Sequence, residues 1–180
     1  VATYTIQINK PATQLTYADM SNHWAHYPAI KLAEKNILRG VEVGGSNIFD
    51  PDGEVTRGEF MVMLMQATEQ DLPITTVSTT GFADDESIPT WMKGYVAAAV
   101  QNDIITGDST QETAVFEAEA PITRAQACVM LTNALKPQEL TTSIKTFADR
   151  DAIPDWATEA IDTMYSCGIL DGYSDNTVRP

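Results

Sequence analysis

Apolar residues recur along most of the chain with the period of a helix that buries one face. Three such stripes each follow a tryptophan, namely Trp24, Trp91 or Trp156. The stripes consist of Ala29, Ile30, Ala33 and Ile37, then of Tyr95, Val96, Ala99 and Val100, and finally of Ala160, Ile161, Met164 and Tyr165. The pattern predicts three helices, called A helices below, with Ser21, Thr90 and Asp155 as N-caps and with ends at Asn36, Asp103 and Gly168.

Two further apolar stripes predict a second kind of helix, called B below, each placed after a Thr-Arg pair. The stripes contain Phe60, Met61, Leu64 and Met65 in one case and Ala127, Cys128, Leu131, Ala134 and Leu135 in the other. Thr56 is followed three residues later by Glu59, and Thr123 by Gln126, which is the pattern of a capping box. Each B helix is therefore predicted to start after its threonine, with an arginine at the first helical position.

The segments outside these helices indicate linkers and one strand. Residues 1–9 alternate between apolar and polar, which is typical of a strand. They resemble the closing strand of a bacterial β-sandwich domain, and a frayed terminus explains them equally well. A linker containing Pro11 follows over residues 9–16, and Thr/Ser-rich stretches with Pro residues indicate linkers at 70–81 and 136–146.

The same residue types recur at fixed distances from the tryptophans, so the helices belong to a repeat of about 65 residues. An isoleucine stands thirteen residues after each tryptophan, and a glycine sixteen residues after it. An aromatic-Ala-Asp triplet precedes each tryptophan, and a Thr-Arg pair follows the first two at a distance of 32 residues. The recurring positions are Tyr17-Ala18-Asp19, Phe82-Ala83-Asp84 and Phe147-Ala148-Asp149 for the triplets, Ile37, Ile104 and Ile169 for the isoleucines, and Gly40, Gly107 and Gly172 for the glycines.

These motifs, in this order, resemble those of the S-layer homology family, over residues 17–180. The resemblance implies an all-α fold, in which tandem helix-loop-helix repeats form a pseudo-threefold bundle, here with a short N-terminal strand or linker. It implies repeats at 17–69, 82–135 and 147–180, the third of them incomplete, after residues 1–16 as the end of an upstream β domain or a linker. The implied function is the non-covalent anchoring of a secreted protein to a Gram-positive cell wall, in the extracellular space or the S-layer.

The family ligand is a secondary cell-wall polysaccharide that carries pyruvate ketals and is therefore anionic. By resemblance, the ligand-binding residues are the triplet aspartates, the tryptophans, the glycines and the Thr-Arg arginines. They are Asp19, Trp24, Gly40, Arg57, Asp84, Trp91, Gly107, Arg124, Asp149, Trp156 and Gly172. No cofactor and no metal ion is expected.

Local physical chemistry supports the arginines independently of the family. The positive end of the helix dipole disfavours a cation at the first helical position, yet Arg57 and Arg124 both occupy it. A helix N-terminus beside a guanidinium suits a carboxylate. The alternative is an internal ion pair between each arginine and a triplet aspartate. For the tryptophans, stacking against a sugar ring and burial in the core both remain open.

Charge and composition narrow the functional classes. The chain has 180 residues and a net charge of −14, which disfavours nucleic acid and anionic membranes as partners. It contains no run of 18 apolar residues, so no membrane insertion is expected. The start at Val1, without a signal-like stretch, indicates a piece of a longer protein. An enzyme is not expected, although a glycan hydrolase using paired carboxylates such as Asp84-Asp85 is an alternative, as is a self-assembling S-layer module.

The third repeat ends before a Thr-Arg pair and a B helix. Without its partner B helix, the third A helix exposes Ile161, Met164 and Tyr165 unless the missing segment, another chain or the N-terminal strand covers them. From this we expect at most two working sites and self-association through the incomplete third repeat.

Overall fold

The computed structural model describes residues 15–68, 77–106, 114–137 and 146–180. These residues belong to two compact units, Val1–Gly53 and Glu54–Pro180, and each unit is described by itself. The predicted N-terminal strand, Gly107 and most of the predicted linker residues lie outside the described residues.

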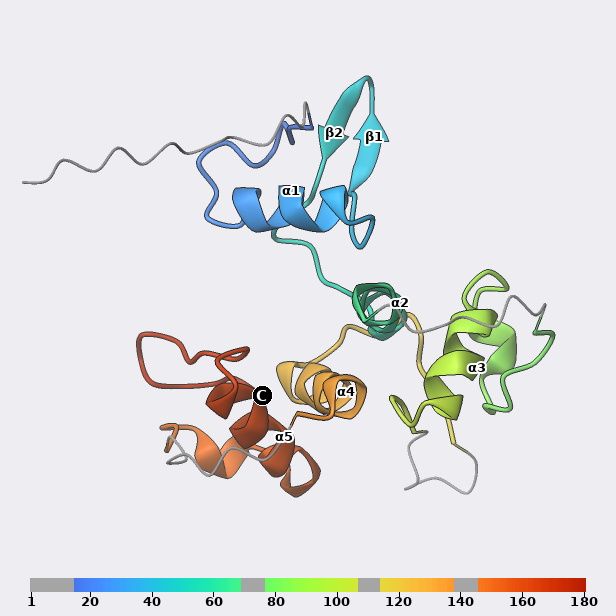
Figure 1. Cartoon of the computed structure of the whole chain (residues 1–180), viewed down its shortest axis with the longest axis vertical. Coiled ribbons are helices and arrows are strands. Elements are labelled where there is room, and N and C mark those ends of the chain that lie inside the picture. Colours follow the sequence, from blue (N-terminus) through green and yellow to red (C-terminus); the bar gives the residue numbers. More distant parts are fainter. Residues whose placement is uncertain (1–14, 69–76, 107–113, 138–145) are drawn as a thin grey trace, which may run out of the picture. The chain divides into compact units, whose positions relative to one another are not determined.

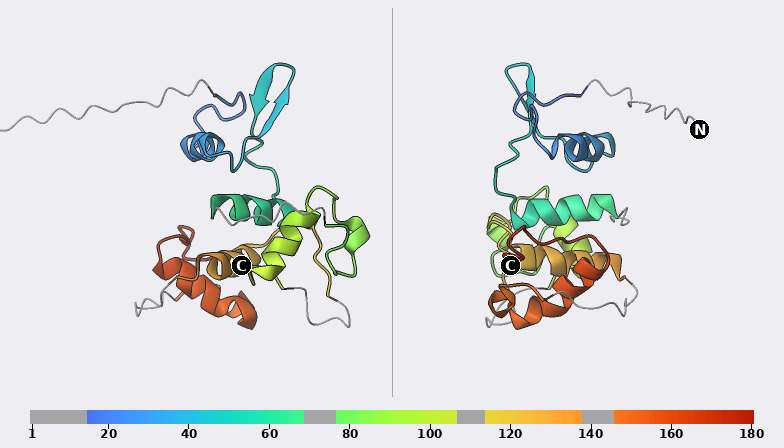
Figure 2. Two further views of the ribbon diagram at one scale, coloured as in Figure 1. Left: turned by 45° about the vertical axis from the view of Figure 1, so that its right-hand side comes forward. Right: turned by 90° about the vertical axis from the view of Figure 1, so that its left-hand side faces the viewer.

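The first unit combines one helix with a hairpin. Helix α1 spans His26–Glu34, and strands β1 (Val41–Val43) and β2 (Ser46–Ile48) pair antiparallel with Val41 opposite Ile48 (Figure 2). Gly44 and Gly45 join the strands, both with positive φ, as a tight hairpin turn requires. The expectation of an all-α fold is therefore wrong for this segment. Tyr17, Met20 and Ala29 form the small core of the unit.

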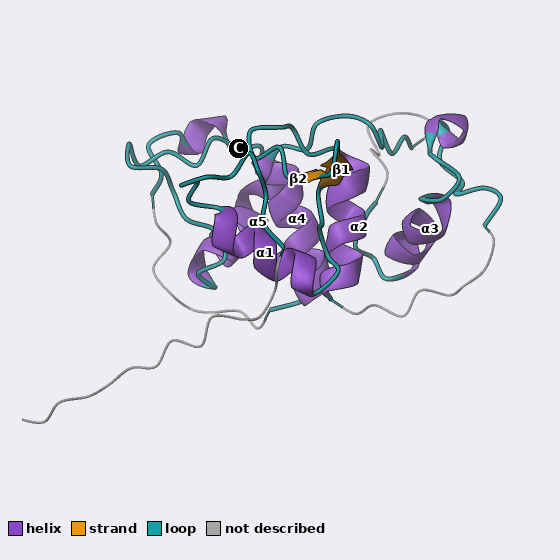
Figure 3. Cartoon of the chain, turned by 90° about the horizontal axis from the view of Figure 1, so that it is seen from above, coloured by secondary structure: helices purple, strands orange, loops and turns teal. Residues whose placement is uncertain are grey.

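The second unit contains four α-helices among its described residues: α2 (Arg57–Ala67), α3 (Lys93–Gln101), α4 (Arg124–Leu135) and α5 (Asp155–Ser166). Short 3₁₀ turns at Asp85–Ser87 and Arg150–Ala152 precede α3 and α5. Helix α2 packs on α3 and α4, and α4 packs on α5 (Figure 1). Loops make up much of the remaining chain (Figure 3).

The helix pairing differs from the one assumed for the third repeat. Helix α3, an A helix, packs on α2, which is the B helix of the preceding repeat, and α5 likewise packs on α4. Ile161 and Met164 are consequently fully buried, and Tyr165 is half-buried. The prediction that these side chains are exposed is wrong, because the partner of an A helix comes from the previous repeat. The expected self-association loses the exposed face on which it rested.

The predicted helix ends are confirmed at the B helices and at the C-termini of the A helices. Both capping boxes form, with Thr56 and Thr123 accepting from the N3 amides of Glu59 and Gln126. Asn36, Asp103 and Gly168 follow the A helices in the left-handed conformation. The predicted N-caps of the A helices are wrong, because Ala25, Met92 and Pro154 hold that position and make no side-chain capping bond.

Candidate functional site

The carboxylate of each triplet aspartate accepts hydrogen bonds from backbone amides in the loop that follows the A helix of its own repeat. In the second repeat, the carboxylate of Asp84 accepts hydrogen bonds from the amides of Phe116 (2.8 Å) and Glu117 (2.7 Å). Asp149 accepts the equivalent bonds from Val178 (2.9 Å) and Arg179 (2.7 Å). Asp19 does the same in the first unit with Phe49 (3.0 Å) and Asp50 (2.6 Å). The family resemblance predicts a ligand role for these aspartates, and the structure shows that they also hold the loop backbone.

The charge of these aspartates follows from the bonds that they accept. The Phe49 amide has the largest effect on the pKa of Asp19 and lowers it; burial raises this pKa and the Asp50 amide lowers it, so that the net shift is downward. For Asp149, burial raises the pKa, and the Val178 and Arg179 amides outweigh it, so that the net shift is downward. Each of these two carboxylates is therefore held in its anionic form.

In each of these loops, an apolar residue (Phe49, Phe116 or Val178) donates its amide to the aspartate, and the next residue adopts the left-handed conformation. Asp50, Glu117 and Arg179 have φ values of 58°, 58° and 51°. Each donates its amide to the triplet aspartate of its own repeat. The three loops thus share one backbone conformation, while the side chain at this position is acidic in the first two repeats and basic in the third.

The N-terminus of α2 is occupied by the loop of the second repeat. The amides of Arg57 and Gly58 donate to the carbonyl oxygens of Ala120 (2.8 Å) and Ala118 (2.9 Å). Thr56 also forms a β-bridge with Pro121. The expected anion site at outward-pointing amides is therefore wrong for α2, because these amides already have partners. Any anion bound here depends on side chains.

The two arginine side chains lie where adjacent repeats meet. Arg57 places its guanidinium 5.6 Å from the ring centroid of Phe116, in the loop of the second repeat. Arg124 donates from Nε to the carbonyl of Val178 and from an Nη to that of Asp171, both at 2.9 Å. Its guanidinium also lies 5.1 Å from the ring centroid of Tyr173. The salt bridges among the described residues do not include Arg124 with Asp84 or with Asp149, so this arginine does not form the internal ion pair considered as the alternative.

All three tryptophans lie on the surface, with Trp24, Trp91 and Trp156 exposed to 84%, 61% and 60%. The core interpretation is therefore wrong. The side chains that follow Trp91 and Trp156, Met92 and Ala157, are buried instead. The second and third A helices thus start with a tryptophan that faces solvent and a following residue that lies in the core.

The N-termini of α2 and α3 pack closely because Gly58, at the start of α2, has no side chain. A Cβ atom built on Gly58 would lie 2.5 Å from the sulfur of Met92. Arg57 and Trp91, which belong to successive repeats, are the chain neighbours of these two residues. At the equivalent positions of the next pair, Ala125 and Ala157 are both buried in one cluster.

The glycines divide into three cases. Gly40 has a φ of 68°, and a Cβ at this position would collide with the carbonyl oxygen of Ile48, so its role in shaping the hairpin base explains the glycine. The amide of Gly172 donates to the side chain of Asp171 at 2.8 Å. Gly107 lies outside the described residues.

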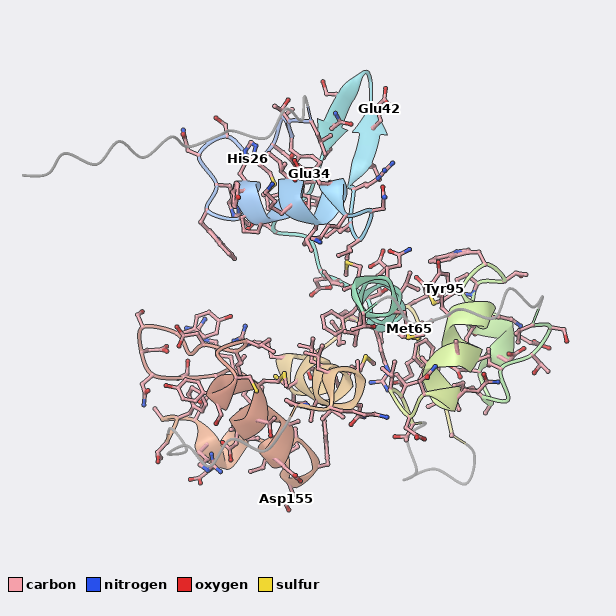
Figure 4. The ribbon with its side chains drawn as sticks, viewed as in Figure 1. His26, Glu34, Glu42, Met65, Tyr95 and Asp155 are labelled. Carbon is pink, nitrogen blue, oxygen red and sulfur yellow. The ribbon has the colours of Figure 1, made fainter. Side chains whose placement is uncertain are left out.

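Among the predicted site residues, the arginines contact the loop of the following repeat, whereas the triplet aspartates bind the loop of their own repeat. Asp19, Trp24 and Gly40 belong to the first unit, whereas Arg57 belongs to the second, beside the second repeat's loop. Figure 4 shows Met65 of α2 and Tyr95 of α3 on the facing sides of these helices, and Asp155 pointing away from α5 at its start. Sequence reasoning missed Phe116 as a contact of Arg57, and it missed Tyr173 and Arg179 entirely; the recurring loop position was the available signal.

Comparison with known proteins matches the S-layer homology domain at three segments, 16–61, 81–128 and 146–180, the last of them shorter. The chain belongs to the S-layer homology domain family. S-layer homology domains are anchoring modules of the bacterial cell surface, and membership places this chain at the cell wall or in the S-layer.

The curated relatives include both enzymes and S-layer proteins. The chain is 27% identical over 172 residues to an amylopullulanase of Thermoanaerobacterium thermosulfurigenes, which covers 92% of this chain and 8% of that protein. It is 27% identical over 173 residues to the exoglucanase XynX of Acetivibrio thermocellus, covering 92% and 15%. It is 27% identical over 163 residues to the S-layer protein sap of Bacillus anthracis, covering 89% and 19%. The chain thus spans less than a fifth of the length of each of these relatives.

Within the described part of the chain, every helix is too short or too polar to span a lipid bilayer. Across ranges 15–68, 77–106, 114–137 and 146–180, no group of three or more His, Cys, Asp or Glu residues could hold a metal ion. The neighbouring histidines have local partners, since His23 accepts from the Ala25 amide and His26 contacts the carbonyl of Met20.

Proposed function

We propose that this S-layer homology module anchors its protein by binding an anionic, pyruvylated secondary cell-wall polysaccharide. The observation that carries the proposal is Arg124, whose guanidinium is held in place by two backbone carbonyls and an aromatic ring. These partners orient the cation without neutralising it. A guanidinium that is fixed and still positive suits the carboxylate of a pyruvate ketal.

The exposed tryptophans supply the second half of such a site. Trp91 and Trp156 present their rings to solvent beside the places where repeats meet. An indole face packs against the C–H groups of a sugar ring, and its N–H can donate to a hydroxyl. Arg57 with Trp91 and Arg124 with Trp156 then form two sites of the second unit. The threefold arrangement of repeats and the repeat boundaries given above remain part of this proposal.

The negative net charge does not oppose an anionic ligand. The chain carries −14 overall, but charges beyond about 8–10 Å are screened at physiological salt. Asp84 and Asp149 use their carboxylates to accept backbone amides. A carboxylate bound at Arg57 or Arg124 therefore responds mainly to the charges within this distance, and not to the net charge of the whole chain.

The hydrolase alternative is disfavoured by the carboxylates. A glycosidase needs one carboxylic acid with a raised pKa to protonate the leaving oxygen. The hydrogen bond from Lys93, with those from Thr80, instead lowers the pKa of Asp85 to about 2. The enzymes among the relatives match this chain over a small share of their length. We propose that the module itself is not catalytic.

The test is retention on purified Gram-positive cell walls that carry a pyruvylated polymer, compared with the same walls after acid extraction of that polymer. The proposal predicts retention on intact walls and loss on extracted ones. Equal retention on both would contradict it and favour self-assembly or a peptidoglycan contact. Release of reducing sugar during the incubation would instead support the hydrolase.

A further inference from the structure

The site between the second and third repeats contains a second arginine that the other loops lack. Arg179 occupies the left-handed loop position at which the first and second repeats carry Asp50 and Glu117. A non-glycine residue with positive φ is uncommon, and aspartate and asparagine tolerate this conformation best. The loop geometry therefore gives no reason for an arginine at this position, and the same backbone accepts an acid.

Arg179 and Arg124 converge on one ring. The guanidinium of Arg179 lies 4.1 Å from the ring centroid of Tyr173, and that of Arg124 lies 5.1 Å from it. Both distances are within the range of a cation–π contact. A turn fixes the ring's position, because the Tyr173 amide donates to the Thr177 carbonyl and the Asn176 amide to the Tyr173 carbonyl, both at 2.9 Å. One aromatic side chain thus holds two like charges near each other.

The acids around this pair leave the cations accessible. Asp149 accepts the amides of Val178 and Arg179, and one oxygen of Asp171 accepts the Gly172 amide. Asp175 pairs with Arg179 at 3.0 Å, but both side chains of this pair are more than half exposed. Exposed pairs of this kind are weak, so a ligand carboxylate can displace Asp175 from Arg179 at little cost.

We propose that Arg179 and Arg124, held on Tyr173, form a two-arginine clamp for the ligand carboxylate, which makes the site between the second and third repeats the tighter of the two. This proposal rests on the proposed function and adds the residue that determines affinity. In the site between the first and second repeats, Glu117 replaces Arg179, so a ligand carboxylate there faces one arginine and a nearby acid.

The test exchanges the two loop residues and measures binding of a pyruvate-ketal N-acetylmannosamine glycoside by titration calorimetry. Arg179→Glu copies the residue that the second repeat tolerates at this position, so the fold is expected to persist. The clamp predicts about a tenfold loss of affinity at the tighter site, since one charge-assisted contact is removed. Arg179→Lys should recover part of it, and Glu117→Arg should tighten the weaker site.

The matched control is Lys136→Glu, which makes the same change in net charge at the far end of α4, about 18 Å along the helix from Arg124. It should change affinity less than twofold. Equal affinities of Arg179→Glu and Lys136→Glu, with the wild type binding normally, would overturn the clamp and leave the proposed function standing. No binding of the glycoside by the wild-type chain would overturn both.

Discussion

At the scale of single residues, the chain separates binding side chains from core side chains within adjacent positions. Trp91 is 61% exposed, and Met92 beside it is 1% exposed. The sequence left open whether Trp91 stacks on a sugar or lies in the core, because periodicity locates an apolar face but does not show which residue at its edge faces solvent. Truncating Trp91 and Met92 separately therefore compares a loss of binding with a loss of stability at adjacent positions.

Trp91→Ala is expected to weaken glycan binding while leaving stability nearly unchanged, because its side chain buries little area. Met92→Ala should cost about 2–5 kcal/mol, as truncation of a buried methionine leaves a cavity. Urea unfolding measures the stabilities, and calorimetry with the pyruvylated glycoside measures affinity. A large loss of stability in Trp91→Ala without any loss of affinity would show that this tryptophan has only a structural role.

The acidic residues predict a loss of stability in acid. Lys93 and Thr80 hold the pKa of Asp85 at about 2, and the pKa of Asp149 is also lowered. Because the folded pKa lies below the unfolded one, near 3.8, the stabilisation is complete above that value and disappears as pH falls through the folded pKa. The melting temperature should therefore fall from about pH 4 toward pH 2.

Asp85→Asn should lower the melting temperature at pH 7 and flatten its dependence on pH below 4. The exposed Glu119 offers a control, and Glu119→Gln should leave the curve as in the wild type. Thermal unfolding followed by circular dichroism measures the melting temperature of each variant as a function of pH. A melting temperature that does not change between pH 4 and pH 2 in the wild type would contradict this account of the carboxylates.

At the scale of elements, packing joins the B helix of one repeat to the A helix of the next. The junction between α2 and α3 pairs Gly58 with Met92, and the equivalent positions in α4 and α5 hold Ala125 and Ala157. The smaller residue on the B helix (glycine in place of alanine) is thus found with the larger residue on the A helix (methionine in place of alanine). The volumes at these two positions should therefore be energetically coupled.

A double-mutant cycle tests the coupling. Gly58→Ala should cost about 1–3 kcal/mol, because the new Cβ meets the end of the Met92 side chain and the Ala118 carbonyl at 3.0 Å. In the double variant with Met92→Ala, the sulfur is gone and the loss should be smaller than the sum of the two single losses. Urea unfolding gives the three values. Additivity within about 0.5 kcal/mol would contradict the direct packing.

Local sequence signals were sufficient for the elements but not for their partners. The capping boxes at Thr56 and Thr123 fix where the B helices start, and this was predictable because both partners are local. Gly44-Gly45 is also a local signal of a two-residue hairpin turn, although the helical periodicity of the repeat predicts no strand there. The pairing of α5 with α4 was not predictable, since an apolar stripe does not name the helix that covers it. The aspartate anchors depend on left-handed loop residues such as Arg179, which local propensity disfavours.

At the scale of the whole molecule, the binding sites of this S-layer homology module are expected where successive repeats meet. Arg57 contacts the loop of the second repeat, and Arg124 contacts that of the third. Both arginines are half-buried, so their removal should lower the melting temperature slightly, more than expected for exposed residues. With one proposed binding site per junction, the second unit should hold at most two glycan molecules.

The most direct measurement is titration calorimetry of the 180-residue chain and its Arg57→Ala/Arg124→Ala variant with the pyruvylated glycoside. Circular dichroism of both proteins serves as the control for folding. The account predicts that at most two molecules bind to each wild-type chain and that the folded double variant shows no measurable binding. Three molecules bound per chain, or wild-type affinity in the double variant, would contradict it.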